Sequence, residues 1–135
     1  ILHEVGGDPR IGGRDLNSES MYEYGSRAGF WRVMRCLEGR GLNFTINAVG
    51  QALTLNPDAA QAIADSGADM HAHGWRWIDY ADMPEDQERS HIRQTVAEIE
   101  RLTGRAPGGW YTGRPSLNTR RLVGWLSSTS ADAAQ

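Results

Sequence analysis

The chain has 135 residues, enough for one domain of modest size. Hydrophobic residues make up 39% of it, a share that permits a packed core and excludes wholesale disorder. Its 14 basic and 17 acidic residues give a net charge of −3, which creates no general attraction for nucleic acid or an anionic membrane. Apolar runs are only a few residues long, so we expect no membrane span.

Cysteine and lysine usage narrow the chemistry further. The single cysteine, Cys36, excludes an internal disulfide and fits a reducing compartment. All 14 basic residues are arginine, which excludes Schiff-base lysines and a P-loop lysine. The stretch Ile1–Val5 has neither a basic start nor an apolar run, so we expect no secretion signal and a cytoplasmic location.

The first half of the chain predicts two helices and one strand. Residues 1–20 contain many glycines and no periodicity, which predicts an irregular segment. Apolar residues at helical spacing predict a helix over Ala28–Glu38, closed by glycines. Alternating β-rich residues predict a strand over Asn43–Val49. An Asn-Pro pair opens a second helix, which covers Asn56–Gly67.

The second half continues the alternation. A short strand is predicted over Asp69–His73. The strongest helical pattern opens at Asp82–Pro84 and closes at Gly104, with an apolar stripe between them. A third strand is predicted over Gly109–Thr112, and Ser116 can cap a last helix.

Helices and strands alternate with short connections, which predicts parallel strands with crossover helices and hence an α/β fold. A closed parallel barrel needs roughly 250 residues, so three strands cannot close one. We expect a partial domain over 21–126, an irregular segment over 1–20 and a frayed tail over 127–135. Unpaired strand edges predict exposed apolar surface, and with it self-association or a chain that completes the sheet.

Two histidines end the second predicted strand and precede two tryptophans. His71 and His73 are two residues apart, so on a strand they point to the same face. Parallel α/β folds place ligand sites at the carboxyl ends of strands. The pair could ligate a metal, or one imidazole could act as acid or base while the other orients it. The alternative is that each histidine is a hydrogen-bonded structural residue.

The stretch Gly108–Ser116 follows the third predicted strand. Trp110 and Tyr111 offer flat apolar surfaces, and Arg114 could clamp a carboxylate or a urea-like group with two parallel hydrogen bonds. The alternative is a buried aromatic strand with a surface arginine. Glu23, which lies between two tyrosines, could be a general base or a supporting carboxylate. Alternatively, Glu23 is a solvent-exposed residue ahead of a helix.

Three segments together resemble one known family. They contain "EYGSRAG", "SGADMHAHG" and "GWYTGR", and they are similar to the polysaccharide deacetylase (NodB-like) superfamily over about Met21 to Val123. Within it they most resemble the branch of allantoinases and cyclic-amide hydrolases. The resemblance implies a distorted parallel β/α barrel, of which this chain has too few strands to close the ring.

The resemblance also bears on metal binding. Typical members hold a divalent metal through one aspartate and an H-x-x-x-H pair. Carried over, His73 matches the first histidine of the pair, and Trp77 stands at the second, where it cannot ligate. The aspartate motif has no counterpart here, and His71 departs from the family pattern. Because the allantoinase branch also has Trp at this place and is regarded as metal-independent, we expect no cofactor. Zinc held by His71 and His73 is the alternative.

The implied reaction is hydrolysis of a non-peptide C–N bond, in a small cyclic ureide or amide or in an N-acetyl sugar. His73 would be the acid or base, and Glu23 would support it. The expected substrate contacts are Trp77, His71, Trp110, Tyr111 and Arg114. Two alternatives remain, a non-catalytic truncated remnant or interaction subunit, and an unrelated H-x-H metal hydrolase.

Overall fold

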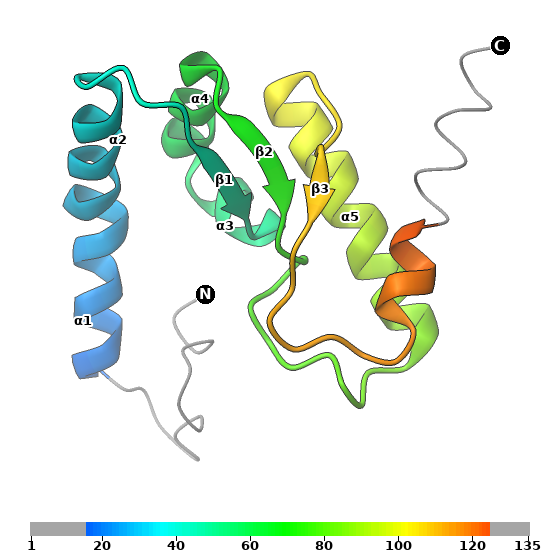
Figure 1. Cartoon of the computed structure of the whole chain (residues 1–135). Coiled ribbons are helices and arrows are strands. Elements are labelled where there is room, and N and C mark those ends of the chain that lie inside the picture. The colour runs from blue at the N-terminus through cyan, green and yellow to red at the C-terminus, as the bar shows by residue number, and fades with distance from the viewer. Residues whose placement is uncertain (1–15, 125–135) are drawn as a thin grey trace, which may run out of the picture.

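Three parallel strands form the centre of the computed structural model, which describes residues 16–124. Strands β1 (Thr45–Ala48), β2 (Asp69–Ala72) and β3 (Gly109–Trp110) lie in the order β1-β2-β3. Both neighbouring pairs are parallel, with Asn47 opposite His71 and His71 opposite Gly109. The predicted α/β fold with an unclosed parallel sheet is confirmed, although each strand is shorter than predicted (Figure 1).

A long helical rod lies beyond the β1 edge of the sheet (Figure 1). It consists of α1 (Leu16–Tyr24), the π-helix η1 (Gly25–Gly29) and α2 (Phe30–Glu38). The irregular segment predicted over 1–20 is therefore wrong for residues 16–20, and residues 1–15 lie outside the described part. The predicted helix start at residue 28 falls inside the rod. The pattern missed α1 because its large apolar residues do not form a buried stripe; Leu16, Met21 and Tyr24 are exposed.

Three helices cover one face of the sheet, the far face in Figure 1. They are α3 (Gly50–Leu55), α4 (Pro57–Ser66) and α5 (Glu85–Thr103), and a further helix begins at residue 119. The predicted Asn56 cap is confirmed, because its side chain accepts a hydrogen bond from the Ala59 amide at 3.2 Å. The short α3 was not predicted. Among residues 16–124, no helix is both long and apolar enough to cross a bilayer.

The core lies between the sheet and these helices. Strand residues alternate in direction, so Ala48, Met70 and Ala72 point toward the helices and are buried. They pack with Leu53, Ala60, Ile63 and Ile99, and Phe30, Ile46, Leu102 and Trp110 border the cluster.

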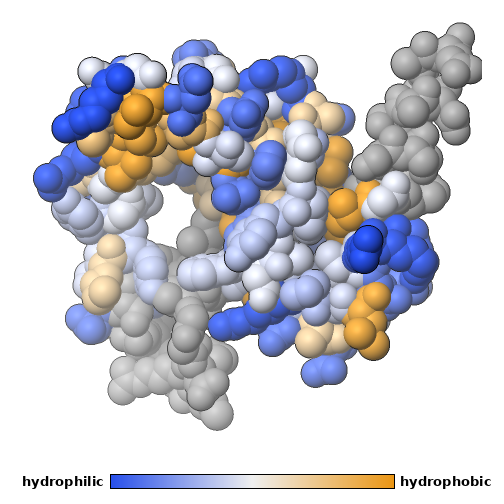
Figure 2. All heavy atoms as spheres, in the orientation of Figure 1, coloured by the Kyte–Doolittle hydropathy of each residue, from blue (hydrophilic) through white to orange (hydrophobic). Residues whose placement is uncertain are grey.

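The opposite face of the sheet is polar. Thr45, Asn47 and Asp69 are exposed there, and His71 is half-buried. Figure 2 shows this face pale to blue where the strands run. The prediction of apolar surface is therefore wrong for this face, because the two-residue period places polar side chains on it. Within the described residues β1 and β3 are edge strands, so association with a partner stays a prediction.

Candidate functional site

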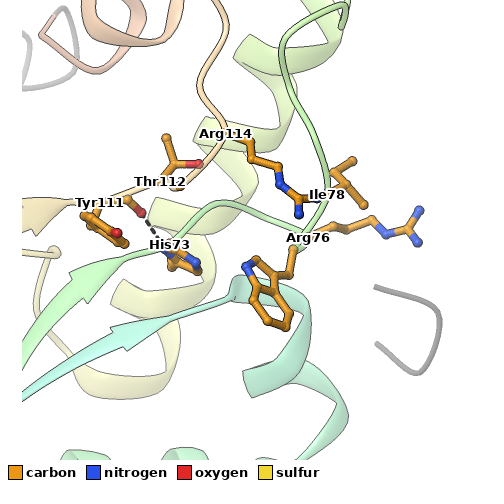
Figure 3. A pocket seen from close by; sticks show the side chains of 8 residues that line it. His73, Arg76, Ile78, Tyr111, Thr112 and Arg114 are labelled. Atoms are coloured by element: carbon orange, nitrogen blue, oxygen red, sulfur yellow. Dashed lines mark hydrogen bonds between the residues drawn. The ribbon is translucent and has the colours of Figure 1, made fainter. Parts of the chain in front are cut away.

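A pocket of about 280 Å³ lies where β2 and β3 end. The segments that follow these two strands line it, because parallel strands end at the same edge of the sheet. Its lining includes His73, Arg76, Trp77, Tyr111, Thr112 and Arg114 (Figure 3).

His73 is held by both its backbone and its ring. Its backbone N–H donates to the Ala48 carbonyl at 2.7 Å, which continues the β1–β2 pairing. Its Nδ1 lies 2.6 Å from the Tyr111 carbonyl oxygen. A carbonyl can only accept, so Nδ1 carries a proton, and in the neutral form of the ring the lone pair is on Nε2. The Tyr111 ring stacks on the imidazole with centroids 5.3 Å apart and planes 10° apart, which fixes the ring orientation.

The loop after His73 is anchored by the start of α3. The amides of Gly50 and Gln51 donate to the carbonyls of Gly74 and Trp75 at 2.9 and 3.0 Å. The Trp75 ring packs directly on Gly50, where an added Cβ would lie 2.7 Å from a ring carbon. Trp75 is therefore a support for the loop, and Gly50 is the residue that makes room for it.

Tyr80 joins the two loops that line the pocket. Its amide donates to the Arg114 carbonyl at 3.1 Å. Its hydroxyl accepts from the Arg76 amide at 3.3 Å and lies 3.2 Å from Nδ1 of His91 on α5. Gly74, with φ of 82°, passes beside this hydroxyl, and a Cβ there would lie 3.1 Å from it. The arrangement ties both loops to the helix behind them.

A buried carboxylate fastens the segment after the second loop. Glu88 on α5 is 1% exposed. It accepts hydrogen bonds from the hydroxyls of Ser116, at 2.5 Å, and Thr119. Thr119 Oγ1 in turn accepts from the Ser116 amide at 2.9 Å. We call these three residues the Glu88 clamp. Nothing in the local sequence pattern marks Glu88, because a glutamate early in a helix usually faces solvent.

The structure separates the aromatic residues predicted to wall the site. Tyr111, Trp77 and Arg114 line the pocket with His73. Trp110 pairs with Ala72 and packs against the core on the helix side of the sheet. Its Nε1 is buried without a hydrogen-bond partner among the described residues. Adjacent strand residues point to opposite faces, so Trp110 and Tyr111 do not share the pocket.

Two other predicted site residues lie elsewhere. The His71 ring lies over Gly109, where a Cβ would come within 3.0 Å of it, and it is not part of the pocket lining. Glu23 on α1 pairs with Arg27 at 2.7 Å on the exposed surface of the rod. Figure 1 places this rod beyond β1, away from the ends of β2 and β3.

The described residues around His73 do not supply a full set of metal ligands. No group of three or more His, Cys, Asp or Glu side chains within residues 16–124 could hold a metal ion. His73 has only Nε2 left to ligate, and Trp77 has no lone pair to offer beside it. Zinc held by His71 and His73 stays an alternative prediction, and within residues 16–124 these two imidazoles would be its ligands.

Comparisons with known sequences identify the family of this chain. The family model of the polysaccharide deacetylases matches residues 18–123. A Schizosaccharomyces pombe protein named for this family is 42% identical over 112 residues, which cover 82% of this chain and 35% of that protein.

Solved structures give the same result. The crystal structures of PuuE allantoinase and of a Pseudomonas aeruginosa PAO1 protein described as a polysaccharide deacetylase each share 45% identity and a TM-score of 0.82. Each match covers 91% of this chain and 41% of the other. A Mycobacterium smegmatis structure at 22% identity and a TM-score of 0.72 shares the fold. This chain therefore spans about two fifths or less of these relatives, and the match over residues 18–123 shows that it belongs to the polysaccharide deacetylase family.

Proposed function

We propose that this chain carries part of a hydrolase site for non-peptide C–N bonds, with His73 as its acid–base residue. The observation that carries the proposal is the hydrogen bond from His73 Nδ1 to the Tyr111 carbonyl. It leaves Nε2 as the ring nitrogen for proton transfer, on a residue that lines the pocket. Membership of the deacetylase family supports hydrolysis as the reaction class.

The proposed reaction uses water as its only co-reactant. His73 Nε2 takes a proton from the water as its oxygen bonds to the carbonyl carbon. The same proton then passes to the nitrogen as the C–N bond breaks. Arg114 donates hydrogen bonds to the carbonyl oxygen, where negative charge develops. Hydrolysis leaves a carboxylic acid, which is ionised at neutral pH, and a free amine or urea NH₂ group. In a cyclic substrate the ring opens and both groups stay on one molecule.

A cyclic ureide or amide is the substrate class that we favour. PuuE allantoinase and the Pseudomonas protein are equally identical to this chain, so overall identity does not separate ureides from N-acetyl sugars. Trp77 does bear on the choice, since it stands where the metal-binding members have their second histidine. An N-acetylated sugar is the second candidate, because Trp77 and Tyr111 expose half or more of their surfaces and could stack on a sugar ring.

A non-catalytic role is the remaining candidate. The edges of β1 and β3 are unpaired within the described residues, and unpaired parallel edges favour association with another strand. In that case the chain would act as an interaction subunit, or would need a further chain that completes the sheet before the pocket turns over substrate.

The proposal is tested by His73→Asn in the purified chain and in any complex it forms. The asparagine side-chain nitrogen takes the place of Nδ1 and can donate to the Tyr111 carbonyl, but the amide cannot shuttle a proton at neutral pH. We expect allantoin or N-acetylglucosamine oligomer hydrolysis to fall by about a hundredfold to ten-thousandfold, with an unchanged melting temperature. Normal turnover in this variant would refute the role of His73. Absence of turnover in the unsubstituted protein with every substrate, alone and in complex, would favour the non-catalytic candidate.

A further inference from the structure

The pocket is positively charged although the whole chain is acidic. Its lining contains the guanidinium groups of Arg76 and Arg114. No aspartate or glutamate of residues 16–124 is part of that lining, whereas the chain as a whole has a net charge of −3. A cleft lined by one sign of charge concentrates ligands of the opposite sign.

Arg114 is the better placed of the two arginines. In Figure 3 its guanidinium extends into the space across from His73, whereas Arg76 extends away from His73. The Arg114 backbone is held by the hydrogen bond from the Tyr80 amide at 3.1 Å, so no ion pair is needed to place this residue. Arg27, Arg89, Arg101 and Arg121, which lie outside the pocket lining, are each paired with a glutamate.

We infer that Arg114 makes this pocket a binding site for a small carboxylate. A guanidinium matches the two oxygens of a carboxylate with two parallel hydrogen bonds. The inference rests on the proposed function for its source of ligand, since hydrolysis of an amide leaves a carboxylate on the reacting carbon. The group that stabilises the developing oxyanion therefore also holds the product. Alternatively, the carboxylate is a substituent that the substrate already carries.

Binding can be measured without turnover. The probes are acetate with its neutral counterpart acetamide, and N-carbamoylglycine with its neutral ring-closed counterpart hydantoin, each titrated into the full chain by calorimetry and amide NMR. We expect both carboxylates to bind and to shift the amides of residues 111–114, and the neutral partners to bind at least about tenfold more weakly. Equal binding of charged and neutral partners would overturn the inference.

Three arginine variants separate a specific contact from general charge. Arg114→Ala should weaken acetate binding about tenfold or more, and Arg114→Lys, which keeps the charge but not the paired donors, should also weaken it. Arg120→Ala removes an exposed arginine outside the pocket. It should change the affinity for acetate by less than about twofold. Equal losses in Arg114→Ala and Arg120→Ala would show nonspecific attraction and refute the site.

The two sources of carboxylate and the two proposals can be told apart. Competitive inhibition of hydrolysis by N-carbamoylglycine, lost in Arg114→Ala, would identify the bound carboxylate as product. Faster turnover of a carboxylate-bearing ureide than of its methyl ester, also lost in Arg114→Ala, would identify it as a substrate group. Arg114-dependent acetate binding without any turnover would leave this inference standing and refute the proposed function. Turnover in a protein whose acetate binding is unaffected by Arg114→Ala would support the proposed function and refute this inference.

Discussion

The pocket and the network behind it use polar side chains in opposite ways. In the pocket Tyr111 and Trp77 are 58% and 50% exposed, and Arg114, which also lines it, is exposed (Figure 3). Behind it Glu88 is 1% exposed and its two hydroxyl donors are also buried. Pocket residues can therefore change with little cost to folding, because solvent replaces their contacts. The buried residues cannot, because nothing replaces a lost partner there.

Glu88→Ala should have the largest effect on stability, because Glu88 is one of the buried residues. It leaves the hydroxyls of Ser116 and Thr119 without their acceptor and opens a cavity. We expect a loss of about 3 kcal/mol in the free energy of unfolding, measured by urea denaturation. Glu88→Gln keeps the shape and one acceptor oxygen, so its loss should be smaller. The matched control is Glu100→Ala, an exposed site on the same helix, which should stay within about 0.5 kcal/mol of the wild type. Equal losses at positions 88 and 100 would contradict the clamp.

Gly50→Ala tests the second support of the pocket. The added Cβ would lie 2.7 Å from the Trp75 ring and 3.2 Å from Thr95 Cα, so the ring or the helix must move. We expect a loss of about 2 kcal/mol in unfolding free energy and altered NMR shifts in the loop 74–80.

The rod supplies the control for this variant. A Cβ at Gly25 would meet no atom within 4 Å, and alanine is favoured over glycine in helices by about 1 kcal/mol. Gly25→Ala should therefore leave stability unchanged or raised. A destabilisation as large as that of Gly50→Ala would show that the close approach of Trp75 is not the cause.

Glu98 is a second carboxylate on α5, and its substitution should have the smallest effect on stability. Hydrogen bonds from Arg101 hold the pKa of Glu98 below its ordinary value; burial opposes this shift, and the Thr54 hydroxyl supports it. A lowered pKa means that the ionised form stabilises the fold at neutral pH and that this contribution is lost as the pH falls through the folded-state pKa. Glu98→Gln should therefore cost about 0.5 kcal/mol at pH 7.

Urea denaturation of the wild type and Glu98→Gln at pH 7 and at an acidic pH below the lowered folded-state pKa of Glu98 checks this expectation. The difference between the two proteins should shrink at the acidic pH, where both side chains are neutral. A difference that is the same at both pH values would show that the ion pair is not its source.

The parts of the fold that depend on local patterns were predictable. Alternation located β1 and β2, and the Asn56 cap and the glycines at 67 and 104, both with positive φ, marked helix ends. The position of His73 and Arg114 followed from the rule that ligand sites lie at strand ends. The helix α1 was missed because its apolar residues face solvent, and α3 because six residues are too few for a periodic pattern.

The remaining features depend on contacts between distant residues. Ser116 and Thr119 meet Glu88 across 28 and 31 positions, and nothing in the local sequence shows that pairing. Trp110 and Tyr111 were assigned together because they are neighbours in the sequence. Strand alternation, applied one residue further, would have placed Trp110 with the core and Tyr111 with His73.

The clamp also restricts insertions and deletions in α5. Glu88 and Ile99 are both buried, one against Ser116 and Thr119 and the other in the core, and they are separated by just over three helical turns. One extra residue between them would rotate Glu88 by about 100° relative to Ile99 and turn its carboxylate away from Ser116 and Thr119. Variation that alters ligand preference should therefore accumulate as length and sequence changes in the loops 74–80 and 111–115, while the number of residues between Glu88 and Ile99 stays constant.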